Sequence, residues 1–68
     1  MPDIHHIFAK RVKETRLRKH LSQGDLAKTL GVHPSYVSGI ERGIRNMTLS
    51  NLDRLARSLG VPITELLQ

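Results

Sequence analysis

The sequence predicts a small all-α protein, a compact bundle of five short helices in a single domain of residues 1–68. Apolar residues in the longer segments recur with a period near 3.6, whereas a half-buried strand requires a period of 2. Aromatic side chains are nearly absent, with only Phe8 and Tyr36. A chain of 68 residues holds one small core, so we expect no catalytic or ligand-binding domain beside it.

The first helix is expected over residues 4–19, with Phe8, Val12 and Leu17 facing the core at helical spacing. The opposite face of this helix is strongly basic. Its cations are Lys10, Arg11, Lys13, Arg18 and Lys19.

Two shorter helices follow, over residues 23–30 and 34–42. Ser22 is the predicted N-cap of the earlier one, and Gly31 lies just past its end, where the chain needs a left-handed residue. Pro34 opens the later one at the first helical position, where proline is tolerated. The residues predicted to pack between them are Leu26, Ala27, Leu30, Val37 and Ile40. Two helices joined by a tight glycine turn form a helix-turn-helix, here at about 23–42, whose second helix enters the DNA major groove.

The last third of the chain predicts two further helices. One runs over 49–59, capped by Thr48 or Ser50 and ended by Gly60. Its predicted core positions are Leu52, Leu55, Ala56 and Leu59. After a Val-Pro turn, a final short helix is expected over 63–67.

The charge is unevenly distributed along the chain. Residues 1–45 contain nine Lys/Arg and four Asp/Glu, a balance of 9 − 4 = +5, whereas residues 46–68 contain two of each and are neutral. The basic part coincides with the helix-turn-helix, which is the distribution expected for binding DNA phosphates. Solubility alone is the alternative explanation.

Several function classes are disfavoured. With no cysteine, disulfides and thiolate zinc sites are excluded, and the four histidines lack the spacing of a metal site. We expect no metal, no cofactor, no small-molecule ligand and no enzymatic activity, because no nucleophile is paired with a base in a recognisable motif. No apolar stretch approaches the length of a membrane span, so a cytoplasmic or nucleoid-associated protein is the default expectation.

The spacing of these residues resembles the lambda-repressor-like helix-turn-helix family, also called the Cro/CI or XRE type. The resemblance covers about residues 8–67 and includes L-S-Q before the second helix, I-E-R-G after the third, and L-x-x-L-A-R-S-L-G-V near the end. Within that family, the run Y-V-S-G-I-E-R-G-I-R-N-M-T-L is most similar to restriction–modification controller proteins.

The resemblance implies a structural ion pair between Arg16 and Glu41, which joins the first helix to the third. It also implies that Gln23, the first residue of the second helix, clamps a DNA phosphate; an ordinary capping-region glutamine is the alternative. Pro34 and Gly39 depart from the family pattern, because many relatives carry long polar side chains there. This departure shifts the expected base contacts toward neighbouring residues.

The remaining DNA-contact candidates lie on the third helix and in the loop after it. His33 could cap that helix or contact DNA, and contact is slightly favoured because histidine is a poor cap. Arg42 is ambiguous between phosphate and solvent, whereas Arg45 is the strongest candidate, because arginine forks onto guanine or phosphate. The full set of predicted DNA contacts is Gln23, His33, Ser35, Tyr36, Ser38, Arg42, Arg45 and Asn46.

The C-terminal segment, about 47–68, is the predicted dimerisation region. Ile63, Leu66 and Leu67 either close the base of the bundle or form a two-fold interface. The second possibility matches the way this family binds palindromes, so the expected partners are double-stranded operator DNA and a second copy of the chain. Two alternatives stay open. One is an antitoxin that represses its own operon, although no toxin-binding segment is visible, and the other is a protein-interaction domain that does not bind DNA.

Overall fold

The computed structural model describes residues 4–44 and 48–68, and over these residues it contains helices and no strand. The elements are α1 Ile4–Arg18, α2 Gln23–Leu30, α3 Pro34–Glu41, α4 Leu49–Leu59 and the 3-10 helix η1 Ile63–Leu66. The predicted all-α class is confirmed. The predicted limits of α2 and α4 are also confirmed, whereas α1 and α3 each end one residue earlier than predicted.

The expected fifth α-helix is a four-residue 3-10 turn instead. The backbone N–H of Glu65 donates to the Pro62 carbonyl at 3.0 Å, and that of Leu67 donates to the Thr64 carbonyl at 3.2 Å. These bonds span three residues rather than four, as in a 3-10 helix, which is used in short pieces. The segment is thus too short to establish the α-helical ladder, and the bundle has four α-helices in its described part.

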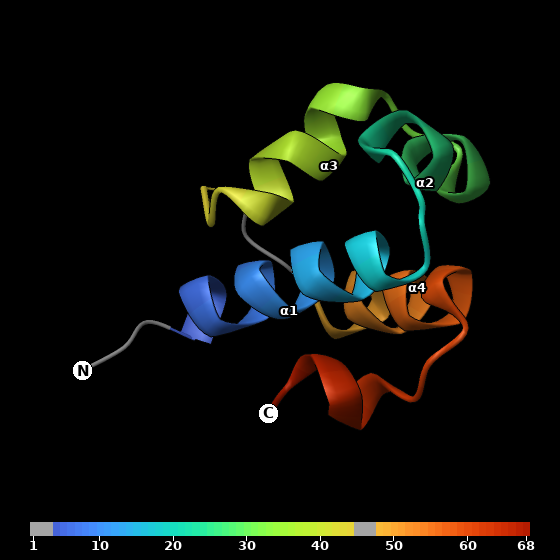
Figure 1. Cartoon of the computed structure of the whole chain (residues 1–68). Coiled ribbons are helices and arrows are strands. Elements are labelled where there is room, and N and C mark those ends of the chain that lie inside the picture. Colours follow the sequence, from blue (N-terminus) through green and yellow to red (C-terminus); the bar gives the residue numbers. More distant parts are fainter. Residues whose placement is uncertain (1–3, 45–47) are drawn as a thin grey trace.

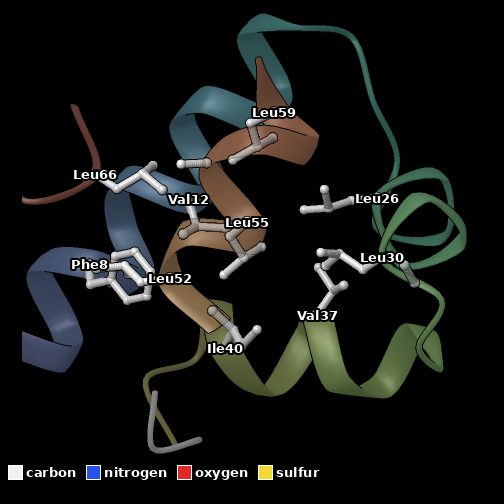
Figure 2. Close-up of a cluster of buried hydrophobic side chains, with 12 residues drawn as sticks. Phe8, Val12, Leu26, Leu30, Val37, Ile40, Leu52, Leu55, Leu59 and Leu66 are labelled. Atoms are coloured by element: carbon white, nitrogen blue, oxygen red, sulfur yellow. The ribbon is translucent and has the colours of Figure 1, made fainter. Parts of the chain in front are cut away.

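The elements form three levels (Figure 1). Helices α2 and α3 lie together at one side, α1 and α4 lie in the middle, and η1 lies at the far side of α1 and α4. The core fills the space between the helices (Figure 2). Its buried members are Phe8, Val12, Leu26, Ala27, Leu30, Val37, Ile40, Leu52, Leu55, Ala56, Leu59 and Leu66.

Two sequence predictions about apolar side chains are wrong. Leu17, predicted to face inward, is 54% exposed, and Leu21 packs against the core instead. Leu66, predicted to lie at a dimer interface, is 0% exposed within one subunit. Figure 2 shows it inside the hydrophobic cluster, on the side of Phe8 and Val12. Leu66 therefore closes the base of the bundle and has no surface left to offer a partner.

Helix α1 ends on an unusual residue. The N–H of Leu21 donates to the Arg16 carbonyl at 3.1 Å, which closes a Schellman turn with His20 at the left-handed position, φ 59°. In α2 and α4 the equivalent position is held by Gly31 at φ 73° and Gly60 at φ 70°. A side chain with a Cβ is strained in this region, so the end of α1 stores strain that the other two ends avoid.

We expect His20→Gly to stabilise the fold by about 1 kcal/mol, because glycine adopts the left-handed conformation without the Cβ clash. His20→Ala keeps the Cβ and serves as the control, with no comparable gain. Urea unfolding followed by circular dichroism measures both variants. Equal stability of the glycine and alanine variants would show that the turn is not strained.

Candidate nucleic-acid interface

Helices α2 and α3 are held together by small and branched apolar side chains packed between them. Leu26, Ala27 and Leu30 of α2 are buried, as are Val37 and Ile40 of α3. Gly31 turns the chain between the helices, and its N–H donates to the Lys28 carbonyl at 3.2 Å. The packing that the sequence predicts between these helices is therefore confirmed.

The exposed side of α3 carries a line of polar residues. Ser35, Ser38 and Arg42 recur at intervals of three and four, which places them on one face of the helix, opposite the buried Val37 and Ile40. We call these three residues the outer stripe. Ser35 and Arg42 are exposed and Ser38 is partly exposed. Helix α3 itself contains no Lys or Arg, so Arg42, its C-cap, is the first cation on this face.

His33 caps the start of α3. Its Nδ1 accepts a hydrogen bond from the backbone N–H of Ser35 at 3.1 Å. The next residue, Pro34, occupies the first turn of the helix, and the His33 backbone is extended at φ −72° and ψ 145°, as a residue before proline requires. The sequence slightly favours DNA contact over capping, and the structure shows the cap. The DNA contact stays a prediction.

Three helices meet at a buried ion pair. The Arg16 Nε donates to Glu41 Oε2 at 2.7 Å and its Nη2 donates to Oε1 at 3.0 Å, a bidentate arrangement. The two side chains are only 8% and 3% exposed. The hydrogen bond to Glu41 raises the pKa of the Arg16 guanidinium above its usual value, so Arg16 stays charged.

Gln23 joins the same cluster. Its Nε2 donates to Glu41 Oε1 at 3.2 Å, so α1, α2 and α3 are linked through one carboxylate. The third nitrogen of Arg16, Nη1, donates to the Leu21 carbonyl at 2.7 Å and holds the turn that leads into α2. We call Arg16, Glu41 and Gln23 the three-helix network. It orients the side chain of Gln23 at the first position of α2, and one amide hydrogen of that side chain is left for another acceptor.

The start of α2 is closed by a reciprocal cap. Ser22 Oγ accepts from the Asp25 N–H at 2.9 Å, and Asp25 Oδ2 accepts from the Ser22 N–H at 2.9 Å. The hydrogen bond from the Ser22 backbone holds the pKa of Asp25 below its usual value. The backbone N–H groups of Gln23 and Gly24 precede the helical ladder and have no acceptor within the helix, so they are available to an anion.

The described cations fall into two groups. Arg11, Arg16, Arg18 and Arg57 pair with carboxylates, and Arg54 donates to the Leu30 carbonyl at 2.7 Å. Among residues 4–44 and 48–68, the lysines and arginines with neither an ion pair nor a hydrogen bond within the protein are Lys10, Lys13, Lys19, Lys28 and Arg42. Four of these lie on α1, on α2 or at the end of α3, and Lys19 lies in the turn that follows α1. On α4, Arg57 is paired with Asp53 and Arg54 is held by the Leu30 carbonyl, and η1 contains no Lys or Arg. The five cations without an internal partner are therefore left for an external one.

Sequence reasoning missed the role of Arg54. Its bond to the last carbonyl of α2 ties α4 to the helix-turn-helix unit across 24 residues of sequence, and no local pattern signals it. Tyr36 is partly buried and packs against the core. Arg45 and Asn46, two of the predicted contacts, lie outside the described residues.

Other kinds of site find no support in the described part of the chain. It contains no group of three His, Cys, Asp or Glu side chains placed to hold a metal ion. None of its helices is long and apolar enough to cross a membrane.

Residues 12–66 match the family model described as Helix-turn-helix. The chain belongs to the helix-turn-helix family. It is 39% identical over 66 residues to the control protein C.BamHI of Bacillus amyloliquefaciens, covering 96% of this chain and 82% of that protein. It is 42% identical over 65 residues to the control protein C.SmaI of Serratia marcescens, covering 96% and 77%.

The crystal structure of the restriction-modification controller protein C.AhdI from Aeromonas hydrophila has the same fold. It superposes with a TM-score of 0.86 and 44% identity, over 91% of this chain and 94% of that chain. The similarity to controller proteins within the helix-turn-helix family is therefore confirmed. It extends over nearly the whole chain and is not confined to the α2–α3 unit.

Proposed function

We propose that this helix-turn-helix protein is a sequence-specific transcriptional regulator that binds a palindromic DNA operator as a homodimer, as a restriction–modification controller. The main supporting observation is the similarity to control proteins in sequence and structure along nearly the whole chain. The physical support is the set of unpaired cations on α1, α2 and the end of α3, since phosphate contacts supply a large share of the affinity of such proteins for DNA.

In this proposal α3 enters the major groove with its outer stripe toward the bases, and Gln23 contacts a phosphate beside it. The amide hydrogen of Gln23 that Glu41 does not accept is the donor for that phosphate. His33 and Tyr36 contribute from the start of α3, and Arg45 and Asn46 contribute from the following loop.

Selection from a random duplex library tests the function. The selected duplex is then compared with a scrambled duplex by fluorescence anisotropy. We expect the selected duplex to bind at least about a thousandfold more tightly at physiological salt, the lower end of the usual specificity ratio. If no duplex is retained, or if both bind equally, the protein is not a sequence-specific regulator and the interaction-domain alternative gains support.

We propose that the homodimer forms through the C-terminal surface. Leu67 is 48% exposed and Ile63 is partly exposed, and both lie at η1, on the side of the molecule away from α2 and α3. Burying them against a second copy removes apolar area from water. To bind a palindrome, the two-fold axis of this dimer has to hold the two α3 helices about 34 Å apart, one turn of DNA.

We expect Leu67→Glu to convert the dimer to monomer, because the interface would have to bury an unpaired charge. Leu17→Glu is the matched control: Leu17 is 54% exposed but lies on α1, outside the proposed interface. Sedimentation equilibrium at about tens of micromolar protein, a range suited to weak dimers, compares both variants with the unmodified protein. A monomeric unmodified protein, or equal effects of the two variants, would contradict this interface.

A further inference from the structure

The N-cap of α3 contains a second contact that the cap itself does not require. Besides accepting from the Ser35 backbone N–H at 3.1 Å, His33 Nδ1 lies 2.8 Å from Ser35 Oγ. Both residues are exposed, and Ser35 is the first member of the outer stripe. One nitrogen of the imidazole ring therefore meets both the backbone and the hydroxyl of the same serine.

These two contacts determine where the hydrogen atoms lie. A backbone N–H can only donate, so the Nδ1 that faces it carries a lone pair, and a neutral ring must hold its proton on Nε2. In the neutral ring Nδ1 has no proton, so the contact at 2.8 Å requires the serine O–H to donate to Nδ1, whose one lone pair then accepts from both the hydroxyl and the backbone N–H. The hydroxyl hydrogen of Ser35 is thus used inside the protein, and only the oxygen lone pairs face outward.

We propose that His33 and Ser35 form an oriented pair that selects bases: His33 offers DNA only a donor, at Nε2, and Ser35 offers only an acceptor. In the major groove the hydrogen-bond donors are the exocyclic amines, N6 of adenine and N4 of cytosine. Ser35 therefore selects an adenine or a cytosine amine at its position and disfavours guanine and thymine, which present acceptors there. This inference rests on the proposed DNA binding.

The pair resolves an ambiguity that serine normally has. A free hydroxyl rotates and can donate or accept, so serine by itself distinguishes bases poorly. In this protein the imidazole holds the hydroxyl in one orientation, and Pro34 between the two residues fixes the backbone that places the ring. Ser38, the next residue of the outer stripe, has no such partner among the described residues and keeps the ambiguity.

The first test uses the protein without DNA. Long-range proton–nitrogen NMR correlations of the His33 ring report which nitrogen is protonated in the neutral form. We expect the proton on Nε2. A ring protonated on Nδ1 would overturn the inference whatever the protein does with DNA.

The second test uses the selected operator duplex with single bases replaced by analogues that lack the amine, purine for adenine and 2-pyrimidinone for cytosine. We expect one position at which this replacement weakens binding by about threefold to tenfold, the equivalent of one hydrogen bond. In Ser35→Ala, the base analogue at that position should not weaken binding, apart from any effect of the analogue on the duplex itself. In the matched control Ser38→Ala the full loss at that position should be retained.

His33→Gly separates the pair from the serine alone. Glycine is tolerated at an N-cap, so α3 should form, but the Ser35 hydroxyl regains its freedom. We expect discrimination between adenine or cytosine and the other two bases to fall at the position found with Ser35→Ala. A contrary outcome is that the operator still binds while removal of the amine weakens binding equally in Ser35→Ala and in the unmodified protein. In that case this inference is wrong and the proposed function stands. If no duplex binds, the proposed function itself fails.

Discussion

Arg16→Ala is expected to lower the free energy of unfolding by about 3–5 kcal/mol, the usual cost of removing one member of a buried ion pair. The variant leaves the Glu41 carboxylate almost fully buried with only the Gln23 amide to compensate it. It also frees the Leu21 carbonyl that Arg16 holds at the entry to α2. A small domain has a total free energy of unfolding of about 5–15 kcal/mol, so the variant would lose a large part of its stability. Urea unfolding measures the change.

The control replaces both partners. Arg16→Met combined with Glu41→Leu removes the two charges together and fills their space with apolar atoms, which is often neutral for buried pairs. We expect this double variant to be far more stable than Arg16→Ala. An Arg16→Ala protein as stable as the unmodified one would show that the three-helix network does not brace α3.

Salt is expected to have the largest effect on DNA binding. If the dimer contacts at least six phosphates, its affinity should fall by about a thousandfold or more between about 50 and 200 mM salt, because released counterions drive the association. The unpaired cations on α1, α2 and the end of α3 are the physical reason. Anisotropy titrations of the selected duplex at several salt concentrations give the log–log slope.

Two arginines provide a matched comparison for this slope. Arg42→Gln removes an unpaired cation beside the outer stripe, so the slope should become shallower by about 0.9 for each protomer. Arg57→Gln removes a cation on α4 whose Nε lies 3.1 Å from Asp53, and the slope should not change. An equal change in both variants would mean that the effect reflects overall charge and not the proposed face.

The sequence predicts those features that short-range chemistry determines. Ser22 and Gly31 bracket α2, and Thr48 and Gly60 bracket α4, because caps and left-handed glycines act within one turn. The limits of both helices follow from these residues. The left-handed turn at the end of α1 is not predicted from the sequence, because His20 and not a glycine occupies that position.

Features that depend on distant residues are not accessible from local patterns. The burial of Leu66 follows from where η1 meets α1 and α4, and helical periodicity does not apply to a four-residue 3-10 turn. The bond between Gln23 and Glu41 spans 18 residues, so the sequence suggests a phosphate contact for Gln23 but not its intramolecular partner. The position of the His33 proton depends on two hydrogen bonds to Ser35, which only coordinates reveal.

Backbone amide chemical shifts, recorded while the selected operator duplex is added to the labelled protein, test the central claim most directly. We expect the largest changes at residues 33–42 and at the N–H groups of Gln23 and Gly24, which lack acceptors within α2. At a protein concentration where the protein is already dimeric, residues 63–66 of η1, on the far side of α1 and α4, should change little. If the largest changes fall on η1 and the end of α4 while residues 33–42 stay unperturbed, DNA binds elsewhere and the account of α3 is contradicted.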